Sequence, residues 1–201
     1  PQAVQADWEK LSALVPRLRV GITRFIAGSE SLLVVLGAEH DRQYLLLFEN
    51  NHELRPTGGF IGSIGLVNIK RGVVENVAVN SVYDPDGQLL KAIAPPEPLR
   101  RIVDRWFLRD ANWFVDYRSS ARTMADFLEK EKGPTVDGVI ALTPEVIKSL
   151  LKITGPIELP AYKVTVDSEN FVPLTQEEVT YTYDRTMNKP KQFLQDLVFF
   201  L

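Results

Sequence analysis

The stretch Glu49-Asn50-Asn51-His52-Glu53-Leu54-Arg55-Pro56-Thr57-Gly58-Gly59-Phe60 is the most informative part of the chain. It follows the continuous apolar run Tyr44–Phe48, which is typical of a strand buried on both faces of a sheet. Pro56 restricts the backbone, and the paired glycines allow positive φ or the close approach of another group. Arg55 offers a planar set of donors suited to phosphate or carboxylate. The stretch therefore reads either as an anion site at a sheet end or as a tight turn with a solvated arginine.

Strand and helix patterns alternate after residue 43, which predicts an α/β fold with a mixed central sheet flanked by helices. The expected strands cover residues 44–48, 60–69, 73–82, 136–142, 157–159 and 164–166, with a hairpin turn at 70–72. The expected helices cover a short segment between residues 95 and 106, then 119–132, 143–153, 175–183 and 190–201. Residues 81–87 read as a turn. Ser119 or Ser120, and Thr143, are the candidate helix caps.

Residues 5–36 carry a helical pattern, with apolar residues mainly four and three positions apart. Pro16, Gly21 and Gly28 interrupt it, which predicts a broken or bent pair of helices. Its apolar stripe has three candidate neighbours: the rest of the chain, a partner helix, or helices that precede the given sequence. We expect an N-terminal helical segment over residues 1–40, as a stalk or packing helices, and an α/β domain over residues 41–201.

The composition excludes several classes of protein. A net charge of −3 over 201 residues argues against a general nucleic-acid binder. No cysteine is present, so disulfides and cysteine-metal sites are excluded. No run reaches the roughly 18 apolar residues of a membrane span, and no signal peptide is visible. The apolar end at residues 197–201 should either be packed or continue into further residues, and we expect the chain to be a piece of a longer protein.

Charged residues give two candidate sites. Arginines are concentrated in the middle of the chain, and several converging on one pocket would neutralise a diphosphate, although solvation or pairing with nearby aspartates is the alternative. They are Arg55, Arg100, Arg101, Arg105, Arg109, Arg118 and Arg122. Asp84 and Asp86 flank Pro85 and are candidate Mg²⁺ ligands, against the alternative of a plain turn.

Three segments resemble the signature of a bacterial surface-protein family, the domain-of-unknown-function family 4012. They are residues 49–62, 108–113 and 136–142. The resemblance runs from about residue 40 to the end. It implies an exported globular part carried by a membrane helix outside this fragment, at the extracellular face of the cell envelope.

The same region is similar, more distantly, to the LytR-CpsA-Psr family, whose members transfer glycopolymers from a polyprenyl-pyrophosphate lipid to the cell wall with Mg²⁺ and arginines. The resemblance covers Arg55-Pro56-Thr57-Gly58, Ser81-Val82-Tyr83-Asp84, the 136–159 unit and Lys191-Gln192. The chain departs from that family at three of these motifs. In Arg55-Pro56-Thr57-Gly58, the family's acidic residue is replaced around Thr57 and Gly58. In Ser81-Val82-Tyr83-Asp84 the family's arginine is missing, and in Lys191-Gln192 the family's arginine is replaced by Lys191.

The resemblance implies roles for several residues. Arg55 and Asp84 are the expected catalytic pair, with Asp84 as the Mg²⁺ ligand. The expected substrate-binding residues are Arg109, Arg118, Arg122, Lys191 and Gln192. The implied partner is a polyprenyl-linked glycan or cell-wall polymer, which the domain would bind and transfer to a cell-wall acceptor. The alternative is a non-catalytic surface module that binds glycopolymer or protein partners, including a protein partner through residues 5–36.

Overall fold

The computed structural model describes the backbone of residues 2–178 and 191–201, and their side chains except for residues 2–11 and 13. Two compact units share the chain. The first contains Pro1–Arg42 and Ile69–Val73, and the second contains Gln43–Asn68 and Val74–Leu201. The expected helix at residues 175–183 falls partly outside the described residues.

The first unit is built on one long helix, α1 (Gln2–Val35). A broken or bent pair of helices was predicted, and the pair was wrong: one helix continues through Pro16, which removes a single backbone donor. Just after α1, Gly37 takes a φ of 70°. The carbonyls of Leu36 and Gly37 accept hydrogen bonds from the backbone N–H groups of Gly72 (2.7 Å) and Arg71 (3.0 Å). The end of α1 is thereby fixed to the tip of the hairpin.

The second unit contains the central sheet, with strand order β3-β2-β1-β4. Its strands are β1 (Arg42–Asn50), β2 (Phe60–Lys70), β3 (Val73–Ser81) and β4 (Gly138–Leu142). The turn between β2 and β3 has positive φ at Arg71 (49°) and Gly72 (79°), as a tight two-residue hairpin requires. β1 pairs with β4 in parallel, with Tyr44 opposite Gly138 and Phe48 opposite Leu142. The mixed α/β fold is therefore confirmed.

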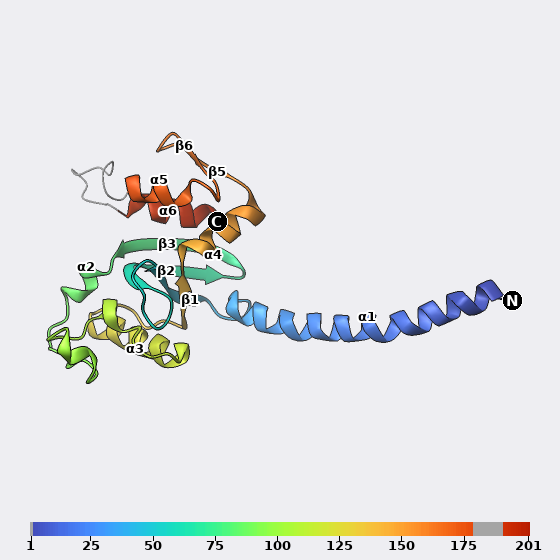
Figure 1. Ribbon diagram of the computed structural model, residues 1–201, viewed down its shortest axis with the longest axis horizontal. Coiled ribbons are helices and arrows are strands. Elements are labelled where there is room, and N and C mark those ends of the chain that lie inside the picture. The colour runs from blue at the N-terminus through green and yellow to red at the C-terminus, as the bar shows by residue number, and fades with distance from the viewer. Residues whose placement is uncertain (1, 179–190) are drawn as a thin grey trace. The chain divides into compact units, whose positions relative to one another are not determined.

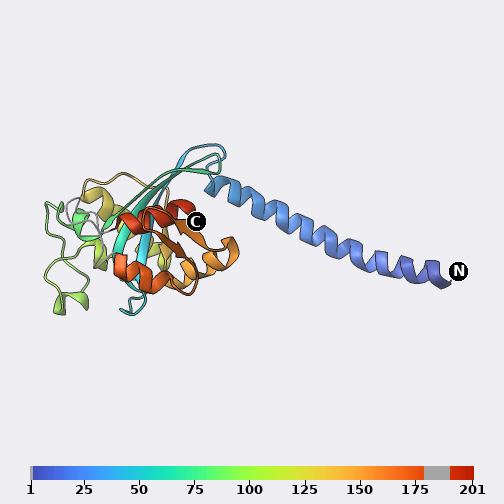
Figure 2. The same ribbon diagram turned by 90° about the horizontal axis from the view of Figure 1, so that it is seen from above.

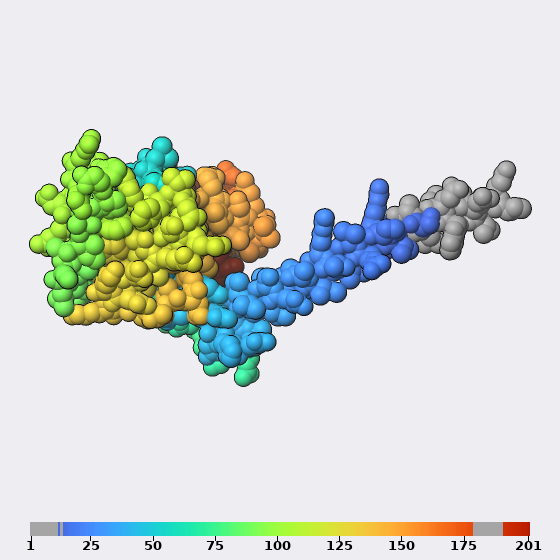
Figure 3. Space-filling model, turned by 90° about the horizontal axis from the view of Figure 1, so that it is seen from below, coloured from blue at the N-terminus to red at the C-terminus, as the bar shows by residue number. Residues whose placement is uncertain are grey.

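Helices cover both faces of this sheet (Figure 1). On one face, Leu45 and Leu47 of β1 pack with Met124, Phe127 and Leu128 of α3 (Tyr117–Lys130). Seen from below, α3 and the preceding connection cover this side of the unit (Figure 3). β1 is buried on both faces, which explains its continuous apolar sequence.

On the other face lies a second core formed by α4 (Pro144–Thr154), α5 (Phe171–Glu177) and α6 (Gln192–Phe200). A small antiparallel sheet of β5 (Ile157–Leu159) and β6 (Val164–Val166) joins it. Seen from above, α5 and α6 lie over the strands (Figure 2). The core centres on Ile147, Leu151, Phe171, Phe193 and Leu197. The unit thus has three layers, with the sheet in the middle.

Three local predictions were wrong. Residues 83–86 form a short helix, α2 (Tyr83–Asp86), instead of a plain turn. Only Leu99–Arg101 are helical between residues 95 and 106, as a single 3-10 turn. The cap of α3 is Asp116, whose carboxylate accepts from the backbone N–H of Ser119 at 2.9 Å. An aspartate satisfies such donors as well as a serine does.

Candidate functional site

A groove of about 530 Å³ opens between the sheet and the layer of α4, α5 and α6. β1 and β4 run in parallel and both end here, with Phe48 beside Leu142. The crevice outside the carboxyl ends of parallel strands is the common binding position in α/β proteins, because the connecting loops diverge there. The topology therefore places the groove.

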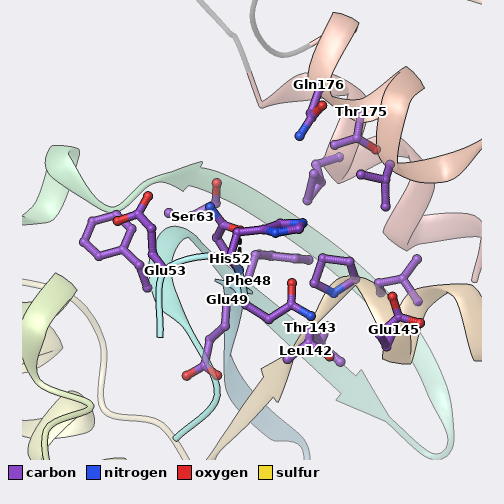
Figure 4. Close-up of a pocket in the computed structure, with 18 of the residues that line it drawn as sticks. Phe48, Glu49, His52, Glu53, Ser63, Leu142, Thr143, Glu145, Thr175 and Gln176 are labelled. Carbon is purple, nitrogen blue, oxygen red and sulfur yellow. Dashed lines mark hydrogen bonds between the residues drawn. The ribbon is translucent and has the colours of Figure 1, made fainter. Parts of the chain in front are cut away.

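Apolar side chains form most of the groove wall. They come from the strand ends, from α2 and α4, and from α5 and α6: Phe48, Phe60, Tyr83, Leu142, Pro144, Ile147, Phe171, Val172 and Leu194. Figure 4 shows Thr175 and Gln176 on one side of the groove, Leu142 and Thr143 on the other, and His52 between them. This is the usual composition of a small-molecule pocket, an apolar wall with a few polar groups.

Two polar groups of the groove, the Lys191 ammonium and the Thr175 hydroxyl, have no partner among the described residues. Lys191 is the only lysine or arginine among the lining residues that the structure describes, and burial lowers its pKa. No described carboxylate lies within ion-pairing distance of its ammonium. The buried hydroxyl of Thr175 has no hydrogen-bond partner in the described part of the chain. Among the described residues, neither side-chain group has a partner.

Glu49, at the end of β1, anchors a buried polar network beneath the groove. Its carboxylate points away from the groove (Figure 4) and accepts hydrogen bonds from the Thr57 hydroxyl (2.8 Å) and the Asn112 side-chain amide (3.2 Å). The same amide also donates to Thr57 (2.9 Å) and to the carbonyl of Gly59 (2.8 Å). Glu49 and Asn112 are 2% and 0% exposed. The network joins two of the three signature segments.

The two glycines of the loop are required by close contacts. A Cβ at Gly59 would lie 2.4 Å from the backbone oxygen of Asn50. A Cβ at Gly58, where φ is 144°, would lie 2.7 Å from the Glu49 carboxylate. The backbone therefore approaches the Glu49 network at a distance that only glycine permits.

A second buried cluster surrounds Arg109. Its guanidinium contacts the carboxylate of Asp86 directly and lies 3.6 Å from that of Asp110. It also stacks on the rings of Phe107 and Tyr83, at 4.3 and 5.4 Å from their centroids. Asp86 accepts a further hydrogen bond from the backbone N–H of Leu108 at 3.0 Å. The Arg109 side chain is thus engaged by the protein itself.

Three carboxyl groups of this cluster have raised pKa values. Burial raises the pKa of Asp86 and of Asp110. The pKa of Glu131 rises to about 8, first through burial and then through the negative charge of Asp86. Glu131 is consequently protonated at neutral pH, which reduces the charge that the cluster buries.

The structure brings together only some of the predicted site residues. Arg55 and Arg109 both lower the pKa of Asp110, so the two guanidinium groups act on one carboxylate. Arg55 also lies over the Phe60 ring, at 5.2 Å. Asp84 is exposed on α2, and Arg118 and Arg122 are exposed on α3. None of these five residues lines the groove.

Lys191 is the one predicted site residue in the groove wall. Its neighbour Gln192 donates instead to Asp196, at 2.8 Å. The sequence did not predict the hydrogen bond between Glu49 and Asn112. It also gave no indication that Glu131 is buried in the cluster around Arg109. For Glu49 a signal existed, since an acidic residue directly ends an apolar strand that is buried on both faces.

Within the part of the chain that the structure describes, no three His, Cys, Asp or Glu residues lie close enough together to hold a metal ion. The same part contains no helix long and apolar enough to cross a membrane.

No curated protein and no solved structure matches the chain. One protein family does, described as "Protein of unknown function (DUF4012)", over residues 39–180. The match includes Glu49, Thr57 and Asn112 of the buried network and most of the groove wall. Because the match spans more than half of the 201 residues, the chain belongs to the DUF4012 family.

Proposed function

We propose that this chain is an envelope domain that binds a polyprenyl-pyrophosphate-linked glycan in the groove between the sheet and the α4–α6 layer. The observation that carries the proposal is the combination of apolar walls with Lys191, a cation that no described carboxylate neutralises. An apolar wall suits a polyprenyl chain, and a partly desolvated ammonium suits a phosphate. The ligand class of this proposal comes from the expected, more distant resemblance of the sequence to LytR-CpsA-Psr proteins.

The remaining polar groups of the groove suit the glycan. Glu53, Glu145 and Gln176 supply oxygens that accept hydrogen bonds from sugar hydroxyls. The N-terminus of α4, where the Thr143 side chain makes no capping hydrogen bond, adds a partial positive charge at the same wall. The ligand would therefore contact the groove with an apolar tail, an anionic centre and a hydroxyl-rich end.

Transfer of the glycan to a cell-wall acceptor is the second candidate function. The positions of Arg55 and Arg109 favour binding without transfer. Arg109 is neutralised by Asp86 and Asp110, and Arg55 donates to the carbonyl of Leu54 at 3.1 Å. Neither side chain lines the groove. A transferase would need such groups at the pyrophosphate to stabilise developing charge.

Mg²⁺ is part of the proposal only if the domain transfers the glycan, and Asp84 is then its proposed ligand. A single carboxylate beside substrate phosphates can hold Mg²⁺, so a cluster of acidic residues is not required. Asp84 is exposed and directly follows Tyr83, which lines the groove. If Mg²⁺ takes part, the affinity for a polyprenyl pyrophosphate should rise when Mg²⁺ is added, and Asp84→Asn should abolish that rise.

The test is direct binding, measured by titration with farnesyl pyrophosphate, together with native mass spectrometry of the purified chain for a co-purified polyprenyl phosphate. Lys191→Ala should weaken binding about tenfold, the effect of losing roughly 1.4 kcal/mol. Lys152→Ala, at an exposed position outside the groove, is the matched control and should leave binding unchanged. Equal affinities for farnesyl pyrophosphate and farnesol would contradict the role of Lys191.

Transfer has its own assay. The chain is incubated with a polyprenyl-pyrophosphate-linked oligosaccharide and peptidoglycan, and release of the polyprenyl phosphate is followed. Binding without release supports a non-catalytic module, whereas release that Asp84→Asn abolishes supports the transferase.

A further inference from the structure

The apolar face of α1 has a regular period that no described part of its own unit covers. Val15, Leu18, Ile22, Phe25, Ser29, Leu32 and Leu36 follow one another at alternating spacings of three and four residues. In heptad notation they occupy consecutive a and d positions, beginning with Val15 at a. This is the spacing that turns one continuous stripe toward a second helix of similar length.

Exposure within α1 follows the same register. Among the side chains of α1 that the structure describes, eleven large apolar ones are exposed, and nine of these fall at a, d or the flanking e and g positions: Leu14, Val15, Leu18, Ile22, Phe25, Ile26, Leu32, Leu33 and Val35. The charged residues Arg17, Arg24 and Glu30 fall at b or c, on the opposite side, and Arg19 falls at e, at the edge of the stripe. The Ser29 hydroxyl donates to the carbonyl of Ile26 at 2.8 Å, so this a position leaves no unpaired donor.

The helix also needs stabilisation from a partner. It contains Pro16, Gly21 and Gly28, and each of these residues lowers the stability of an isolated helix. Most helical stability in proteins comes from packing of an apolar face. In the single chain the apolar face of α1 is about half exposed over more than three heptads, so packing does not provide that stability.

We propose that α1 pairs with α1 of a second copy of this chain as a parallel, in-register coiled coil. In that arrangement a g residue faces the e residue five positions later in the partner helix. Gly21 would then face Ile26, and Gly28 would face Leu33, so each glycine makes room for a large side chain. An antiparallel pair would instead oppose glycine to glycine and leave gaps.

The buried area is sufficient for a stable dimer. Nine large apolar residues that are each about half exposed would remove roughly 800 Å² from water per helix, which makes a standard interface of roughly 1,600 Å² in total. The charged residues at b and c stay in solvent, and Arg19 at the flanking e position can pack its alkyl stem while its guanidinium stays in water, so pairing requires no burial of charge.

The experiment uses the 201-residue chain in sedimentation velocity over a range of concentrations. We expect a dimer that Ile22→Glu, at an a position, converts to monomer. Val20→Glu, at an f position, is the matched control, because Val20 and Ile22 are 50% and 58% exposed in the single chain. A monomeric chain at 100 μM, roughly a hundred times a micromolar dissociation constant, would overturn the proposal. So would an equal response to both substitutions.

Cross-linking tests the orientation on a chain that has no cysteine of its own. Leu18→Cys and Leu32→Cys, introduced separately at two d positions, should each form a disulfide-linked dimer under mild oxidation. An antiparallel pair would cross-link at no more than one of them. Val20→Cys should cross-link poorly in either case, and efficient cross-linking there would contradict the assigned seam.

Discussion

The carboxylate of Glu49 accepts a hydrogen bond from the side-chain amide of Asn112 at 3.2 Å, across 63 positions of sequence. The same amide reaches Thr57 and the backbone of Gly59, so one side chain holds both ends of the loop that follows β1. Glu49 itself lies in the wall of the groove, where its carboxylate points inward to the protein (Figure 4). The network therefore fixes the floor of the groove by a buried interaction.

Asn112→Ala should destabilise the second unit by about 3 kcal/mol, because it leaves a buried carboxylate with Thr57 as its main partner. Urea denaturation measures this change. Thr57 offers a matched pair: Thr57→Val removes the hydroxyl, whereas Thr57→Ser keeps it. Thr57→Val should cost roughly 1–3 kcal/mol and Thr57→Ser much less. Equal losses for the two Thr57 variants would show that the hydroxyl contributes nothing.

Gly59→Ala should be among the most damaging single-methyl additions in the chain, since the new Cβ would collide with backbone atoms of Asn50 at 2.4 Å. Backbone cannot yield as a flexible side chain can, so we expect a loss of several kcal/mol, above the roughly 1–3 kcal/mol of ordinary overpacking. The control is Gly62→Ala in β2, where a Cβ meets nothing within 4 Å. Thermal unfolding compares the two variants. Similar melting temperatures would contradict the close approach at Gly59.

The sequence predicted the strands well because their signal is local. The apolar run at 44–48 and the Ile/Val-rich segments around Lys70-Arg71-Gly72 correspond to β1, β2 and β3. The loop after β1 was also identified as the main feature. Its physical role was not, because the partner of Glu49 lies 63 positions away in a segment that reads as an ordinary aromatic loop.

Long-range burial explains the other differences from the sequence-based expectations. Asp84 and Asp86 look equivalent in sequence, yet Asp86 is buried against Arg109 while Asp84 faces solvent. Glu131 reads as a charged residue at a helix end, and only the fold places it beside Asp86. Such pairings depend on which segments meet, and no local pattern encodes that.

Arg109→Met should destabilise the protein by roughly 3–5 kcal/mol, because it removes the cation that compensates buried Asp86 and Asp110. Arg122→Met, at an exposed position on α3, should change stability by no more than about 0.5 kcal/mol. Chemical denaturation at pH 7 gives both values. If Arg109 instead serves a ligand, Arg109→Met would leave stability unchanged and weaken farnesyl pyrophosphate binding, and the structural role assigned to it would be wrong.

The buried carboxyl of Glu131 should make stability depend on pH. Its pKa rises from 4.5 to about 8 on folding, so between these values the folded protein holds a proton that the unfolded chain has lost. The stability that this proton provides is complete below pH 4.5 and is lost as the pH rises toward 8, by about 1.4 kcal/mol per pH unit if the group titrates alone. Other groups add their own dependence, so the informative quantity is the difference between two variants.

Glu131→Gln replaces the protonated carboxyl by a neutral group of the same shape that cannot ionise. Relative to the native chain, the variant should gain stability steadily from pH 5 to pH 8, because only the native chain must keep a proton bound there. Glu129→Gln, at an exposed position in the last turn of α3, two residues before Glu131, is the control and should follow the native profile. Melting temperatures measured at half-unit pH steps test this. Parallel profiles for the native chain and Glu131→Gln would mean that Glu131 is already ionised in the fold, and that Arg109 neutralises it together with Asp86.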